Sequence, residues 1–395
     1  MKKLLFILLI CFMITPFLSA NDDKWRIPDR SMEFGIAQTE FGFSNSFFNL
    51  TDIFNETIII DIDKLNDGFV LNFDLDVTPL YFSFNSQNNW GFGFSAGTDV
   101  TGNIDLSGNM LTFKEAINEK SDFAMAAFAH AQLSGFFNIA QFTIKLAPSV
   151  FFPVIYSQPS ITYNKNNTDQ GTVLVLDYKL QIFSAMSQDP ASFGEIKASP
   201  GFDISLGVEY PLAEAIGLKD KIGFLDFSLG LDIFNFPMVA GQLQDYMVMD
   251  GRIGSNVPID ILKGGLPDDF ILVNEAKYGV EPKSIKRPFN MHLWADWRPF
   301  GFLGITPAIG FSLNDSYLKP FSFEGGLKAR FDLANFFVAS VGVGYYDRVW
   351  INSLDLALNL RAFELNLGVN LRSNKFAESW LSGSPGARFG LKFGW

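Results

Sequence analysis

The stretch GARFGLKFGW, residues 386–395, decides the predicted fold because it ends the sequence in an alternating pattern. Ala387, Phe389, Leu391, Phe393 and Trp395 fall on one face of an extended strand, since successive side chains point to opposite faces. Glycines and two basic residues occupy the alternate positions and fall on the other face. A soluble strand also alternates, but it rarely stops on an aromatic residue. The stretch therefore predicts an amphipathic final strand.

Phe389, Leu391, Phe393 and Trp395 make this stretch resemble the last strand of Gram-negative outer-membrane β-barrel proteins. In that family the final strand carries apolar residues at alternate positions and stops at an aromatic residue. The barrel-assembly machinery reads this pattern. The resemblance implies an assembly signal at these four residues. It also implies the barrel-assembly machinery, periplasmic chaperones and outer-membrane lipid as partners.

The N-terminus predicts export to the cell outer membrane through a cleaved signal peptide, residues 1–20. Two lysines precede an almost wholly apolar run, Leu4–Leu18, and small residues follow at Ser19 and Ala20. The alternative, a transmembrane anchor, is disfavoured because about fifteen apolar residues are short for crossing a bilayer. Cys11 follows Ile10, which is not small, and this argues against a lipid anchor.

The composition favours many antiparallel strands over membrane-spanning helices. The chain is 48% apolar with 44 Phe, yet no run of eighteen apolar residues follows position 20. A barrel needs no such run, because only every second residue faces lipid. The alternative is a secreted β-sandwich or β-helix, which would bury its apolar face. The net charge of −12 includes no basic patch for nucleic acid. The only cysteine lies in the predicted signal peptide, which excludes a disulfide scaffold.

Alternation predicts an all-β transmembrane antiparallel barrel over residues 69–395, after an N-terminal periplasmic or lumenal segment with the first strand, 21–68. Fifteen segments alternate, and bacterial barrels have even strand numbers, so we expect about 14 strands, with 12 and 16 as alternatives. The predicted strands are near 34–43 and at 69–77, 90–97, 123–133, 142–150, 172–183, 202–210, 225–233, 289–298, 302–312, 321–332, 336–346, 351–361, 363–372 and 386–395.

One tight hairpin is predicted at Arg361-Ala362. Apolar residues are even-numbered from Leu354 to Leu360 and odd-numbered from Phe363 to Leu371, and a tight turn shifts the phase in this way. Connections near the C-terminus alternate between short and long, as barrels with short periplasmic turns do. A long extracellular loop is therefore predicted at about 237–288.

The polar face of each strand is predicted to line the lumen. Charges of both signs there either select solutes or form a supporting network of ion pairs, and both readings stay open. The loop at 237–288 is likewise either a lumenal constriction or lid, or a surface loop without a ligand role. The candidate lumen-lining residues are Asp226, Asp232, His292, Asp296, Glu324, Lys328, Arg330, Arg361, Glu364, Arg388 and Lys392.

The sequence gives little support to an enzyme, a metal site or a cofactor. The chain has two histidines, His130 and His292, and neither has a carboxylate within reach on its own strand. Four residues of strand separate His292 from Asp296 by about 13 Å. Only a partner from another strand would complete a catalytic site. No G-x-S-x-G elbow, phosphate-binding loop or zinc spacing occurs.

These observations predict an outer-membrane channel or transporter for small or hydrophobic solutes. The alternative is a non-conducting surface barrel, such as an adhesin or a structural outer-membrane protein. The strand number and the apolar residues of the 237–288 segment are similar to those of the long-chain fatty-acid transporters. The N-terminal hatch motif of that family is not recognisable in this sequence, so no site residue is carried over from it.

Overall fold

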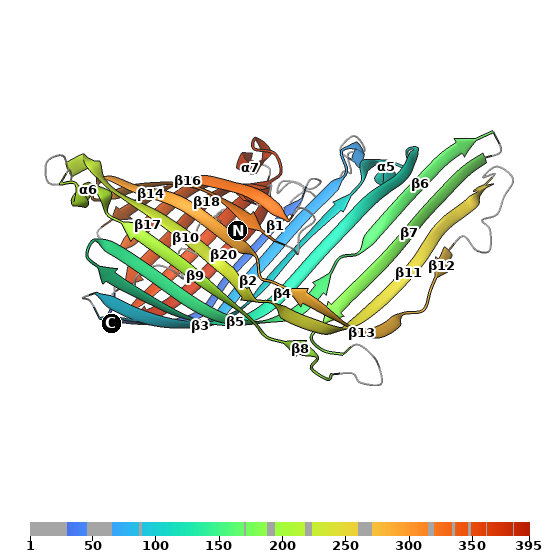
Figure 1. The fold of residues 1–395 in the computed structure, drawn as a ribbon. Helices are drawn as coiled ribbons and strands as arrows, with labels where there is room; N and C mark the ends of the chain where they lie inside the picture. The colour runs from blue at the N-terminus through green and yellow to red at the C-terminus, as the bar shows by residue number, and fades with distance from the viewer. Residues whose placement is uncertain are drawn as a thin grey trace, which may run out of the picture.

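The computed structural model describes residues 30–45, 65–86, 89–169, 171–187, 194–217, 223–259, 271–314, 320–333, 336–346, 349–360, 362–381 and 383–395. Its strands belong to one antiparallel sheet that curls into a barrel (Figure 1). The predicted signal peptide, 1–20, and the candidate lumen residue Arg361 lie outside the described residues.

The barrel wall is a closed ring of antiparallel strands. β20 closes it by pairing with β1, from Glu33 opposite Gly394 to Phe41 opposite Ala387. Such a ring leaves no unpaired edge in its wall, which is the condition for a sheet to cross lipid. In spatial order the ring contains β1 (Met32–Asn45), β2 (Phe69–Asn85), β3 (Trp90–Leu106), β4 (Ala116–Ile139), β5 (Phe142–Ser157), β9 (Gly201–Tyr210), β10 (Asp226–Val239), β14 (Phe289–Phe300), β15 (Leu303–Leu313), β16 (Phe321–Leu333), β17 (Phe337–Tyr346), β18 (Val349–Leu360), β19 (Phe363–Ser373) and β20 (Ser384–Gly394).

Among the described residues the whole sheet has twenty strands, so the expectation of about 14 strands is too low. The others are β6 (Ser160–Thr168), β7 (Gly171–Ser184), β8 (Ala198–Ser199), β11 (Gly241–Ile259), β12 (Ile271–Val273) and β13 (Lys277–Ile285). Alternation missed β6 because its sequence, SITYNKNNT, has only Ile161 and Tyr163 as large apolar or aromatic residues. It predicted β7 as a strand, but β7 pairs chiefly with β6 and β11 and does not complete the ring.

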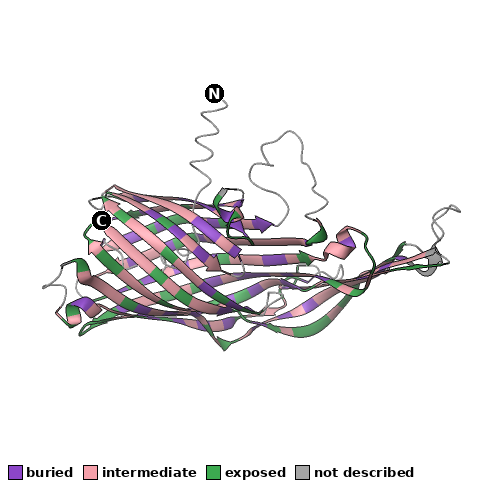
Figure 2. Cartoon of the chain, turned by 90° about the horizontal axis from the view of Figure 1, so that it is seen from above, coloured by how far each residue is buried: buried purple, intermediate pink, exposed green. Residues whose placement is uncertain are grey.

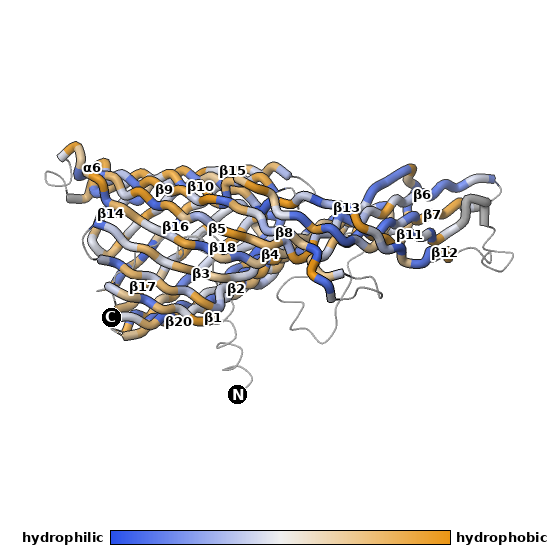
Figure 3. The backbone as a smooth tube through the Cα atoms, turned by 60° about the horizontal axis from the view of Figure 1, so that its bottom comes forward, coloured by the Kyte–Doolittle hydropathy of each residue, from blue (hydrophilic) through white to orange (hydrophobic). Residues whose placement is uncertain are grey.

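We call β6, β7, β11, β12 and β13 the extension, because they run beyond the rim at the end opposite Trp395 (Figures 1 and 3). The described residues of the segment 237–288 lie largely in strands, which corrects the prediction of a loop. β11 begins two residues after the end of β10 and lies beyond the rim. There it forms backbone hydrogen bonds with β7 and β13, so the sheet extends past the rim. Arg252 on β11 contacts Asp177 on β7 at 2.7 Å, and this hydrogen bond raises the pKa of Arg252.

The barrel is apolar outside and polar inside, the reverse of a soluble protein. On β20, Phe389 and Phe393 are 43% and 41% exposed, whereas Lys392 between them is 2% exposed. The alternation recurs around the wall (Figure 2). The predicted final strand and its two faces are confirmed, and so is the hairpin between β18 and β19, where Leu360 pairs with Phe363.

Aromatic side chains gather at two levels of the wall. Near the short turns they form pairs such as Phe84–Trp90, Phe142–Tyr210 and Phe300–Phe302, with ring centroids 4.7–5.6 Å apart. Near the other rim the rings of Phe289, Phe311 and Phe321 form a chain at about 6 Å spacing. Phe302 and Phe311 are nine residues apart, about 23 Å along the axis of a tilted strand. Two aromatic girdles flanking an apolar band of about 25 Å are typical of transmembrane barrels.

In the part of the chain that the structure describes, helices are confined to short connections. They are α5 (Gly108–Leu111), α6 (Leu212–Ala215), the 3-10 turn η1 (Gly223–Leu225) and α7 (Glu378–Leu381). The Ser107 hydroxyl caps α5 by accepting a hydrogen bond from the backbone N–H of Met110 at 3.2 Å. Among the described residues no helix is both long and apolar enough to span a membrane.

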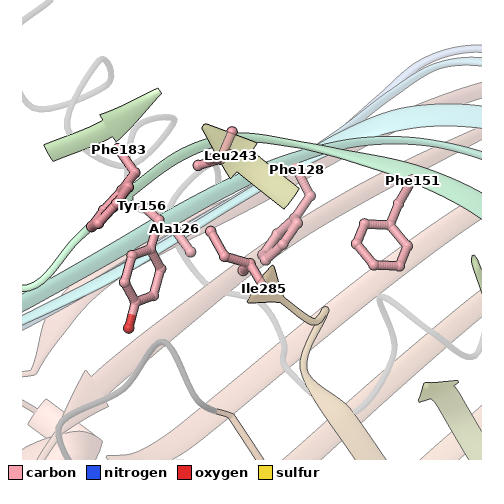
Figure 4. Close-up of a cluster of buried hydrophobic side chains, with 7 residues drawn as sticks. All are labelled: Ala126, Phe128, Phe151, Tyr156, Phe183, Leu243 and Ile285. Atoms are coloured by element: carbon pink, nitrogen blue, oxygen red, sulfur yellow. The ribbon is translucent and has the colours of Figure 1, made fainter. Parts of the chain in front are cut away.

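A cluster of buried apolar side chains joins the extension to the barrel (Figure 4). Phe128 from β4 and Phe151 from β5 pack edge to face with ring centroids 5.9 Å apart, and each is 1% exposed. β7, β11 and β13 contribute Phe183, Leu243 and Ile285. This junction cluster comprises Ala126, Phe128, Phe151, Tyr156, Phe183, Leu243 and Ile285.

Candidate functional site: the lumenal cavity

The barrel encloses a cavity of about 520 Å³. Its lining comes from both halves of the chain, for example Glu40 on β1, Asp99 on β3, Glu324 on β16 and Arg388 on β20. Ten acidic and seven basic side chains line it, so the wall carries an excess of negative charge. Apolar groups, including Phe234 and Trp294, lie among them. The cavity can therefore contact both the apolar and the charged parts of a small molecule.

The structure divides the predicted lumen residues into two groups. Seven line the cavity: Asp232, His292, Asp296, Glu324, Lys328, Arg330 and Arg388. Asp226, Glu364 and Lys392 are not part of its lining. Lys392 Nζ lies 3.9 Å from Glu364 Oε1, and both side chains are at most 3% exposed. This pair is buried in the part of the barrel near the C-terminus.

One row of residues crosses four neighbouring strands. Asp232 on β10 is paired with His292 on β14, His292 with Gly310 on β15, and Gly310 with Glu324 on β16. His292 Nε2 lies 2.5 Å from Glu324 Oε2, so the imidazole reaches across β15. Trp294 Nε1 donates a hydrogen bond of 2.6 Å to Asp232 Oδ2. The row and Trp294 together bring two carboxylates and two nitrogen-containing rings to one side of the cavity.

Gly310 makes this contact sterically feasible. A Cβ atom at this position would lie 2.5 Å from His292 Cδ2 and 2.1 Å from the Met291 carbonyl oxygen. We expect Gly310→Ala to displace His292 from Glu324 and to lower the free energy of unfolding by about 1–3 kcal/mol through overpacking. Urea titration of the refolded protein in lipid vesicles measures this loss.

Gly304→Ala is the matched control on the same strand. Its Cβ would lie 3.5 Å from its nearest neighbour, Asp296 Oδ1, which is an ordinary contact. Equal losses for the two variants would contradict the steric explanation.

Two arginines tie the closing strands to the start of the barrel. Arg388 on β20 contacts Glu40 on β1, with Nη2 3.2 Å from Oε2, and its Nη1 lies 3.9 Å from Asp355 on β18. Arg372 on β19 forms an ion pair with Asp74 on β2, across β20 and β1. These pairs favour the interpretation that the lumen charges on this side of the wall form a supporting network of ion pairs.

A second buried charge cluster, which we call the Arg287 cluster, lies where the extension joins the barrel. Arg287 follows β13 and its side chain is 6% exposed. Its guanidinium lies 3.0 Å from Asp99 Oδ2 and 3.4 Å from Asp203 Oδ2, and donates to Ser149 Oγ at 3.1 Å. His130 Nδ1 lies 3.1 Å from the same Asp99 oxygen. One arginine therefore joins β3, β5 and β9.

Sequence reasoning missed several of these residues. Glu40, Asp74 and Arg372 lie on polar faces of predicted strands, so the alternation that selected Arg388 could have found them too. Arg287 fell in the predicted loop, and no local pattern indicates a buried arginine there. Ion pairs between residues hundreds of positions apart leave no trace in a single sequence.

Both histidines have carboxylate neighbours on other strands. His130 meets Asp99 of β3, and His292 meets Glu324 of β16. Asp296, which shares a strand with His292, instead accepts hydrogen bonds from Arg298 at 2.7 Å and Thr306 at 2.9 Å. Within the described part of the chain, no group of three or more potential ligands is arranged to hold a metal ion.

The fold is similar to those of solved outer-membrane channels. A deletion mutant of TodX, a monoaromatic hydrocarbon channel, superposes with a TM-score of 0.52 at 9% identity, covering 93% of this chain and 90% of that chain. The chain is an outer-membrane-type β-barrel that resembles TodX in fold. The Pseudomonas putida toluene transporter TodX gives 0.49 at 9% identity, with 96% and 93% covered.

A Pseudomonas aeruginosa FadL homologue gives a TM-score of 0.43 at 8% identity, with 91% and 88% covered. Of these three similarities, only the one to the TodX mutant has a TM-score above 0.5. No protein-family model matches the chain, and no curated protein matches it in sequence. The likeness to TodX therefore concerns the backbone fold alone.

Proposed function

We propose that the protein is a channel or transporter of the outer membrane that passes small hydrophobic solutes. The observation that carries this proposal is the cavity of about 520 Å³ inside a closed ring of strands. That size suits a small organic molecule. The fold likeness to TodX supports the proposal, because that protein is a monoaromatic hydrocarbon channel. In this reading the C-terminus faces the periplasm and the extension faces the exterior.

Uptake of radiolabelled toluene tests the proposal in a Gram-negative host whose lipopolysaccharide slows the entry of hydrophobic compounds. We expect cells producing the protein to take up toluene several-fold faster than cells with the empty vector. Uptake at the vector rate would refute the proposal, provided that the barrel is folded. Folding is checked on a denaturing gel, because a closed barrel resists detergent until it is heated and therefore migrates differently before and after boiling.

The extension favours one alternative, a non-conducting surface barrel that acts through its exposed strands. Tyr278 and Val280 on β13 are 43% and 68% exposed, and the strand also carries exposed charge. Single-channel recording and toluene uptake by the same protein separate the two functions. A folded barrel that neither conducts ions nor speeds uptake supports the alternative.

A further inference from the structure

One wall of the cavity contains hydrogen-bond acceptors that have no protein donor. Glu324 is 3% exposed, and its Oε1 atom has no hydrogen-bond partner, whereas Oε2 contacts His292. Asn290, two residues before His292 on the inward face of β14, is 5% exposed, and its Oδ1 atom also has no partner. Both residues line the cavity. Buried acceptors without partners are costly, and a ligand that donates hydrogen bonds would remove that cost.

Aromatic rings line the same cavity as these acceptors. Phe234 and His292 pack edge to face with ring centroids 5.9 Å apart, and Phe234 is 6% exposed. The hydrogen bond to Asp232 fixes the indole of Trp294 on the same wall. Such rings contact an apolar group and also attract a cation held over a ring face.

We propose that this wall is a binding subsite for a protonated amine attached to a small apolar or aromatic group. An ammonium donates three hydrogen bonds and accepts none, which matches Glu324 Oε1 and Asn290 Oδ1. The acidic excess of the cavity lining favours a cation over an anion. The proposal rests on the channel function proposed above, and it assigns the class of solute that the channel selects.

The test measures binding of three ligands of similar shape to the full-length refolded protein by isothermal titration calorimetry. The ligands are 2-phenylethylammonium, neutral 2-phenylethanol and anionic 3-phenylpropanoate. We expect the ammonium to bind at least about tenfold tighter than the carboxylate. Glu324→Gln should weaken ammonium binding about tenfold or more, because it removes a charge-assisted hydrogen bond. It should leave the affinity for 2-phenylethanol within about twofold.

Glu378→Gln is the matched control, because it removes one carboxylate from α7, away from the cavity lining. If Glu324→Gln fails to fold, Asn290→Ala tests the same wall, with an expected loss of about two- to tenfold for the ammonium. Equal affinities for ammonium and carboxylate in the unaltered protein would overturn the subsite. So would a folded Glu324→Gln variant that binds the ammonium as tightly as the unaltered protein does.

The outcomes separate the subsite from the channel function. A protein that speeds toluene uptake but shows no preference for the ammonium refutes the amine subsite alone. A folded barrel that speeds no uptake and binds none of the three ligands refutes both proposals.

Discussion

Replacing Arg287 with alanine is expected to lower the free energy of unfolding by about 3–5 kcal/mol. The change leaves Asp203, 1% exposed, and Asp99 without the guanidinium that compensates their charges. Removing one partner of a buried ion pair costs this much, because the remaining charge stays buried without compensation. Urea titration in lipid vesicles, followed by tryptophan fluorescence, measures the loss.

Arg252→Ala is the matched control, because Arg252 and Asp177 form an ion pair with side chains 39% and 42% exposed. An exposed pair contributes much less to stability than a buried one, because water screens its charges. Similar losses for the two arginines would show that burial does not set the strength of the Arg287 cluster. Arg287→Lys keeps the positive charge, but a lysine ammonium lacks the planar guanidinium that contacts three partners at once. We therefore expect Arg287→Lys to lower the free energy of unfolding less than Arg287→Ala does, but still measurably.

Replacing Phe128 with alanine is the second large expected change, with a loss of about 3–5 kcal/mol in the free energy of unfolding. The phenyl ring is 1% exposed and packs against Phe151 where the extension leaves the barrel. Its removal takes apolar area out of contact and leaves a cavity that the strands on either side can fill only in part. The same urea titration measures the effect.

Val280→Ala provides the comparison on the extension, because this side chain is 68% exposed. We expect it to change the stability by no more than about 0.5 kcal/mol. Limited proteolysis adds a second readout, since loosening of the junction cluster should speed cleavage in β6 and β7 before the barrel itself is cut. Proteolysis of Phe128→Ala at the unaltered rate would show that the cluster does not hold the extension in place.

The sequence by itself determined where the strands of the wall lie and which face of each is apolar, although it counted β7 among them. A period of two is a local property, so the residues from Phe389 to Trp395 reveal a final strand without any knowledge of its neighbours. The phase shift at Arg361-Ala362 likewise identifies a hairpin, because a tight turn must keep both apolar faces on the same side. The polar faces of these strands supplied seven cavity-lining residues for the same reason.

Only the tertiary structure decided which strands pair and which side chains contact one another across the lumen. Arg388 meets Glu40, 348 positions earlier, because the last strand closes on the first. His292 reaches Glu324 because the side chain between them is missing at Gly310. The extension arises because β10 continues into β11 beyond the rim, where hydrogen bonding to β7 holds it in the sheet. Alternation fixes the face of a side chain, but its partner depends on register and closure, which are properties of the assembled sheet.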